Sequence, residues 1–137
     1  MKPLIHAKSS VKKYGGAVED YLAIHNFIDQ SKMCMPDIRH RALLHSSFGC
    51  YLAEQMFGVY VVNSDGKQVS VRDVAEEHII QDLGFIPSVE KWLDKIPMEP
   101  WMSGAVKKTV MKFDRPNAEP LVFPEHPIMP RVDAAFD

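Results

Sequence analysis

The chain has 137 residues, of which 46% are hydrophobic and 25% are charged, and its formal net charge is −2. A chain of this length and composition fits one globular domain with a core of its own. The slight negative charge excludes an extended nucleic-acid-binding surface, which needs a basic excess, and no segment has the roughly 20 apolar residues of a membrane span.

Two helices are predicted in the first half of the chain. Residues 1–16 are polar and end in a turn at Gly15-Gly16. A helix is predicted over residues 18–32, because apolar side chains recur there at helical spacing. A second, longer helix is predicted from Pro36 to Gly58, since proline suits the first position of a helix and glycine follows its end. Its apolar side chains cover a wide arc, so we expect this helix to be central.

The pattern changes to strands after the second helix. The letters VYVV, NSDG and KQVSV over residues 59–71 predict a strand, a turn and a strand, which together form a β-hairpin. A third helix is predicted over 71–83, capped by Ser70 and closed by Gly84. A short fourth helix follows over 89–96. The predicted fold is mainly α with one β-hairpin, an α+β domain in which about four helices form a compact bundle.

The last third of the chain is rich in proline. Residues 104–114 fit a short helix or a strand, and the five prolines between 116 and 130 exclude a regular helix or a central strand. The apolar side chains among them favour an extended arm that lies on the domain or on a neighbouring subunit, with a disordered tail as the alternative. We therefore predict a helical domain over 1–101, with the hairpin inserted at about 59–71, and a C-terminal extension over 102–137 that could join a homo-oligomer.

Three histidines lie on the apolar faces of three different predicted helices. They are His25, His45 and His78, and an aspartate follows two of them by four residues, at Asp29 and Asp82. Imidazoles and carboxylates that converge from several helices can hold a divalent metal ion. This pattern predicts a metal site, and the alternative is a buried hydrogen-bonded network.

A second cluster is basic and precedes His45 by one helical turn. Arginine side chains bind phosphate or carboxylate groups through two parallel hydrogen bonds. The residues predicted to hold a small anionic or nucleotide-like ligand are Arg39, His40, Arg41, His45, Arg72 and His78. The alternative for either arginine of the 39–41 run is a solvated ion pair, for example with Asp37. Residues 40 and 45 are separated by about 140° around a helix, so we do not expect both rings to face one metal ion.

Three blocks of the sequence resemble a family of small uncharacterised proteins of tailed bacteriophages and bacteria. The blocks are HAKSSVKKYGGAVEDYLAIH, RHRALLHSSFGCYLAEQMFG and NSDGKQVSVRDVAEEHIIQDLGFIPSVEKWL, and the likeness covers about Lys2 to Trp101. The matching positions are His6, Tyr14, Gly15, Gly16, His25, Arg39, His40, Arg41, His45, Arg72, His78 and Asp82. Small phage proteins often bind and block a host component, so the resemblance implies a binding role, with a host protein as an alternative partner.

These observations favour a binding protein over an enzyme, since the sequence holds no complete catalytic motif, Walker loop or dinucleotide fingerprint. The first alternative is a metal-dependent enzyme such as a phosphohydrolase, with His25, His45 and His78 as ligands and a divalent metal as cofactor. The second is a protein-interaction module without a small-molecule site. The two cysteines match no zinc or disulfide spacing, and no signal peptide is evident, so we expect a cytoplasmic location, in the bacterial host if a phage encodes the protein.

Overall fold

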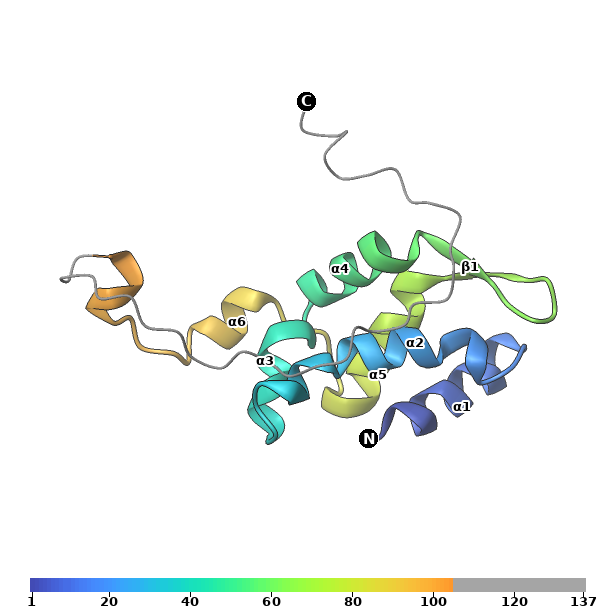
Figure 1. The fold of residues 1–137 in the computed structure, drawn as a ribbon, viewed down its shortest axis with the longest axis horizontal. Helices are drawn as coiled ribbons and strands as arrows, with labels where there is room; N and C mark the ends of the chain where they lie inside the picture. The colour runs from blue at the N-terminus through green and yellow to red at the C-terminus, as the bar shows by residue number, and fades with distance from the viewer. Residues whose placement is uncertain (105–137) are drawn as a thin grey trace, which may run out of the picture.

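The computed structural model describes residues 1–104, which form a helical domain with one β-hairpin (Figure 1). The α-helices are α1 (Pro3–Tyr14), α2 (Glu19–Ile28), α3 (Arg41–Leu44), α4 (Ser47–Phe57), α5 (Val71–Leu83) and α6 (Val89–Leu93). Short 3-10 helices are η1 (Gln30–Met33), η2 (Ile38–His40) and η3 (Pro100–Ser103), and the strands are β1 (Tyr60–Val62) and β2 (Gln68–Ser70). The predicted mainly α fold with one hairpin is confirmed.

Helix α5 is the centre of the domain, because it packs against α1, α2 and α4 (Figure 1). Ser70 caps its first turn by accepting a hydrogen bond from the amide of Asp73, and Gly84 ends it in the left-handed conformation at φ 83°. These bounds agree with the sequence prediction. The buried face of α5 consists of Val71, Val74, Ala75, His78 and Ile79. A histidine therefore stands in the middle of an otherwise apolar face.

The N-terminal segment forms a helix that the sequence analysis did not predict. Pro3 occupies the first turn of α1, where a missing amide hydrogen costs nothing. The residues that face the core are His6, Ala7 and Ser10, which are too small or too polar to give an apolar stripe. The helix ends at the predicted turn, where Gly15 and Gly16 have φ values of 83° and 77°.

The predicted long helix over 36–58 is wrong, because this segment starts with a 3-10 turn and then breaks at residues 45 and 46. Residues 38–44 form η2 and α3, and α4 begins only at Ser47. His45 has a non-helical conformation at φ −81° and ψ 65°, and Ser46 is extended and caps α4 through a hydrogen bond from the amide of Gly49. Several apolar side chains assigned to the central arc are exposed: Ile38, Phe48, Tyr51 and Met56. The first and fourth predicted helices are right in kind but too long, since α2 gives way to η1 after Ile28 and α6 stops at Leu93.

The hairpin pairs antiparallel, with Val61 opposite Val69. Its turn is fixed to the α1–α2 connection by Asn63, whose side-chain amide donates to the carbonyl of Tyr14 and to the Tyr21 hydroxyl. No helix in the described part of the chain is long and apolar enough to cross a membrane. The predicted element over 104–114 and the Pro-rich arm lie, from residue 105 onward, outside the described residues.

Gly49 is the residue that lets α4 begin so close to the end of α3. A Cβ atom at this position would lie 1.8 Å from the backbone oxygen of Leu44. We expect Gly49→Ala to lower the free energy of unfolding by about 1–3 kcal/mol, because the break must move to make room. Urea unfolding followed by circular dichroism checks this, with Ser47→Ala, an exposed change in the same turn, as the control. A Gly49→Ala midpoint equal to that of the control would contradict the expectation.

Candidate functional site

Five histidines and two aspartates meet in the core of the domain. They are His6, His25, His40, His45, His78, Asp29 and Asp82. Each histidine is at most 4% exposed, and the side chains of the two aspartates are 5% and 2% exposed. Buried carboxylates and imidazoles are costly unless they are paired, so their assembly requires a physical explanation.

Regular helices deliver five of these side chains, and the first of them is His6 on α1. Helix α2 carries His25, and Asp29 follows at its end. Helix α5 presents His78 and Asp82 one turn apart, so that the ring Nε2 lies 3.3 Å from a carboxylate oxygen. The predicted pairing along α5 is thus present. The Asp29 carboxylate turns away from its own helix and lies 3.2 Å from Nε2 of His78.

The irregular segment before α4 carries His40, Arg41 and His45. His40 ends η2, Arg41 begins α3, and His45 follows α3. The Ser31 hydroxyl donates to the backbone carbonyl of His40, and the indole Nε1 of Trp92 donates to that of His45. Because the chain is not one helix here, the expectation that residues 40 and 45 point apart is wrong. The Nε2 atoms of both rings approach the same oxygen of Asp29, at 3.6 Å and 3.5 Å.

The nitrogen and oxygen atoms at the centre have the spacing of metal ligands. Nε2 of His45 is 2.9 Å from Oδ2 of Asp82 and 3.5 Å from Oδ1 of Asp29, and Nε2 of His78 lies between the same two oxygens. Two ligands at about 2.1 Å from one ion, at tetrahedral or octahedral angles, are about 3.0–3.4 Å apart. One atom from each of Asp29, His45, His78 and Asp82 lies within 4.8 Å of all the others.

Two further rings turn a bare nitrogen toward these carboxylates. Nδ1 of His40 is 2.7 Å from the carbonyl oxygen of Asp37 and must donate to it. Nδ1 of His6 is 2.6 Å from Oε1 of Gln81, whose amide nitrogen donates to the Ser9 hydroxyl. In a neutral ring the other nitrogen then carries a lone pair. The Nε2 atoms of both rings are buried without a hydrogen-bond partner, and they face oxygens of Asp29 and Asp82 at 3.6 Å and 3.2 Å.

His25 lies behind this centre and not in it. Its Nδ1 is 2.9 Å from Nδ1 of His78, and its Nε2 is 2.8 Å from the Ser10 hydroxyl, which donates to the carbonyl of His6. These distances fit one chain of hydrogen bonds, in which Nδ1 of His78 donates to Nδ1 of His25, Nε2 of His25 donates to the Ser10 hydroxyl, and that hydroxyl donates to the carbonyl of His6. In this arrangement His25 fixes the orientation of the His78 ring, as a carbonyl or carboxylate does for many metal-binding histidines. The atoms of His6, His25 and His78 also form a second close group.

The charges of the cluster are set by burial and by these contacts. Burial lowers the pKa of His25 to about 2 and that of His45 to about 4, and it also lowers the pKa of His6. Burial opposes the charge of His78 as well, but hydrogen bonds to the two carboxylates outweigh it and raise its pKa. For the aspartates, burial raises the pKa, but hydrogen bonds and nearby positive charge lower it, to about 2 for Asp29 and well below its usual range for Asp82. The contacts therefore favour the charged form of His78 between the two carboxylates, and the N-terminal ammonium also donates to Asp82, at 2.9 Å.

Of the residues predicted to hold an anion, the structure brings His40, Arg41, His45 and His78 to the cluster. The Nη2 atom of Arg41 lies 3.8 Å from Oδ1 of Asp82. The other two arginines are engaged on the surface: Arg39 pairs with Asp37 at 2.7 Å and Arg72 pairs with Glu54 at 2.6 Å. For Arg39 the solvated ion pair was the stated alternative, and the partner is the one that the sequence suggested.

The predicted metal ligands His25, Asp29, His45, His78 and Asp82 all lie in or beside the cluster. The sequence analysis gave no role to His6, since α1 was not predicted, and it placed His40 only in the anion site. The spacing of His6, Ala7 and Ser10 was the available signal for His6. The position of His40 depends on the break in the chain before α4, and the spacing of apolar residues in the sequence does not reveal this break.

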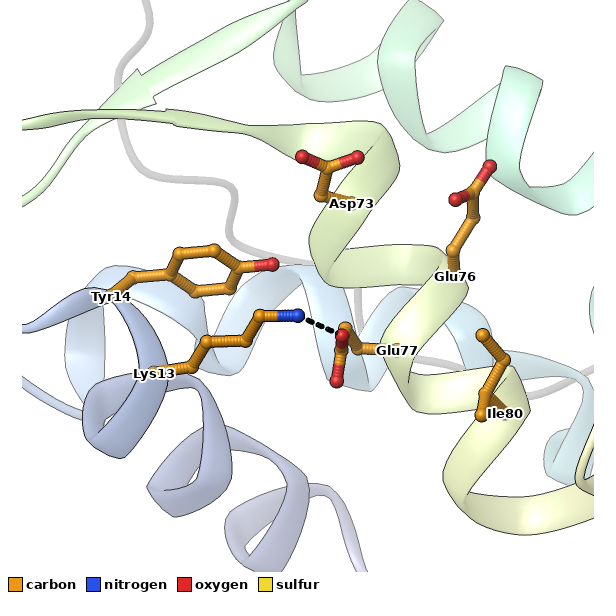
Figure 2. A pocket seen from close by; sticks show the side chains of 6 residues that line it. All are labelled: Lys13, Tyr14, Asp73, Glu76, Glu77 and Ile80. Carbon is orange, nitrogen blue, oxygen red and sulfur yellow. Dashed lines mark hydrogen bonds and ion pairs between the residues drawn. The ribbon is translucent and has the colours of Figure 1, made fainter.

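A separate cavity of about 340 Å³ lies between α1 and α5 (Figure 2). Its lining residues are Lys13, Tyr14, Asp73, Glu76, Glu77 and Ile80. Lys13 forms an ion pair with Glu77, and the cavity includes none of the clustered histidines. One of its carboxylates, Glu77, is already paired with Lys13, and the groups of described residues that could hold a metal ion include none of the cavity's carboxylates.

Comparison with known proteins identifies the family of the chain but gives no activity or ligand. A family model described as a domain of unknown function (DUF6915) matches residues 1–102. No curated protein and no solved structure matches the chain. The phage origin, the host partner and the cytoplasmic location stay predictions.

The buried neutral histidines predict that the metal-free protein loses stability in mild acid. His6, His25 and His45 have pKa values below 6.5 in the folded state, so unfolding takes up protons as the pH falls through that value. His78 has a raised pKa and acts in the opposite direction, which leaves a net uptake. We expect the free energy of unfolding to fall as the pH drops from about 6.5 to about 5, by up to about 1.4 kcal/mol per pH unit for each net proton.

Urea titrations in the presence of a chelator measure this slope. His25→Gln keeps a polar group beside His78 and should reduce the slope by removing one buried neutral ring. A free energy of unfolding that stays level or rises on acidification would show that these rings are not held neutral.

Proposed function

We propose that this chain, which belongs to the family of domain of unknown function DUF6915, binds a divalent transition-metal ion in its core. The ligands would be Asp29, His45, His78 and Asp82, with His40 as a fifth. Imidazole and carboxylate ligands together suit ions such as zinc, iron or manganese. The observation that carries the proposal is the set of nitrogen–oxygen separations of 2.9–3.6 Å around one point.

The orientation of the His40 ring fits that of a metal ligand. Its Nδ1 proton is committed to the carbonyl of Asp37, so in the neutral ring a lone pair faces a carboxylate oxygen at 3.6 Å. Two lone pairs repel each other unless a cation lies between them. Histidines that bind metals commonly donate their other nitrogen to a backbone carbonyl, which is the arrangement of His40.

The charge balance supports the same reading. In the metal-free protein the proton on Nε2 of His78 lies between oxygens of Asp29 and Asp82, at 3.2 Å and 3.3 Å. A divalent ion can replace that proton and neutralise both carboxylates. Binding would then release a proton, as is usual when a histidine becomes a ligand.

The interpretations made from the sequence are narrowed by this proposal. In this proposal His25 does not bind the metal ion but orients the ring of His78. Asp29 and Asp82 bind the ion directly. Catalysis by a metal-dependent phosphohydrolase and the role of an interaction module stay predictions.

Metal loading of the tag-free protein tests the proposal. The protein is stripped with a chelator, reloaded with zinc or manganese, desalted and subjected to elemental analysis. We expect close to one ion per chain, and a loss of affinity on the order of 100-fold in Asp29→Asn and Asp82→Asn, which remove the charge with little change of shape. Asp94→Asn, at an exposed aspartate after α6, is the matched control and should bind as the parent does.

Circular dichroism establishes that each variant is folded. If Asp82→Asn does not fold, the visible spectrum of the cobalt-loaded parent, compared with that of His40→Gln, still reports whether the imidazoles coordinate. A parent protein that takes up no ion after reloading, or aspartate variants that bind as well as Asp94→Asn, would leave only the structural network.

A further inference from the structure

Arg41 is the one arginine of the described residues that reaches the cluster. Its side chain is 21% exposed, while that of Asp82 beside it is 2% exposed. The guanidinium group therefore extends from the buried centre to the surface of the domain. No other side chain within 4 Å of the Asp82 carboxylate, apart from the N-terminal residue, is as exposed.

Among residues 1–104, the side chain of Arg41 has no hydrogen-bond partner. Its Nε is buried without a partner. Its Nη2 lies 3.8 Å from Oδ1 of Asp82, which is too long for a hydrogen bond. A buried guanidinium donor without an acceptor is costly, and arginine recognises oxyanions through two parallel N–H donors. Arg39, only two positions earlier, has both sides of its fork occupied by Asp37.

We infer that Arg41 and the metal ion together bind a phosphoryl group, so that the natural ligand of the site carries a phosphate. This inference rests on the metal site proposed above. Two aspartates, a divalent ion and Arg41 together give the loaded site a net positive charge. The excess favours an anion at the edge of the site where Arg41 lies.

The number of donors favours phosphate over carboxylate. A ligand that bridges the ion and the arginine needs one oxygen for the metal and two for Nε and the Nη group. A phosphoryl group offers three such oxygens, whereas a carboxylate has only two. The exposed end of Arg41 marks the side from which the rest of the ligand would extend.

Phosphorus relaxation with the manganese-loaded protein tests the inference, because the paramagnetic ion accelerates relaxation only of phosphate that is bound within a few ångströms. The probe is inorganic phosphate. We expect a saturable enhancement with the parent and at least a tenfold weaker apparent affinity in Arg41→Gln. Arg39→Gln removes the neighbouring arginine, which is already paired on the surface, and should behave as the parent does.

Elemental analysis of each sample separates the two proposals. A parent without manganese contradicts the metal site itself. A manganese-loaded Arg41→Gln that binds phosphate as tightly as Arg39→Gln leaves the metal site intact and overturns the role of Arg41. Acetate at equal concentration should not displace the phosphate, and displacement would overturn the assignment to a phosphoryl group.

Discussion

Two aspartate carboxylates buried among imidazole rings impose the main constraint on this structure. Asp29 and Asp82 are ionised in the core, and an unpaired buried carboxylate costs several kcal/mol. The helices must therefore be arranged so that rings from α1, α5 and the segment before α4 can reach one or both carboxylates. The apolar side chains of α5 and α2 fill the remaining space around the cluster. The fold is in this sense built around a charged centre and not around a purely hydrophobic one.

The regular parts of this arrangement could be predicted from the sequence. The bounds of α5 follow from Ser70, Gly84 and the apolar spacing between them, and the hairpin follows from its turn residues. His78 and Asp82 could be placed together because a helix of known bounds fixes their relation. His25 was also placed correctly on the inner face of its helix. These are cases in which local propensity and the tertiary fold agree.

The remaining parts depend on contacts that no local pattern records. The break at His45 is held by the Trp92 indole and by the amide of Ser47, which donates to the carbonyl of Pro87. Both partners come from a segment at least 40 positions away along the chain, and local spacing could not reveal them. The apolar residues between 38 and 56 suggested one continuous helix, but several of the side chains expected in its core are exposed. A rigid helix would have pointed His40 and His45 apart, so the error in secondary structure became an error in the site.

The cluster draws its members from nearly the whole of the described chain, and this affects how the domain folds. His6 hydrogen-bonds to Gln81 across 75 positions, and His78 to Asp29 across 49. Such contacts form only after long loops have closed, which places them late in folding. Interactions absent from the transition state slow unfolding and leave the folding rate nearly unchanged. We therefore expect substitutions in the cluster to change mainly the unfolding rate, and substitutions in α5 or the hairpin to change mainly the folding rate.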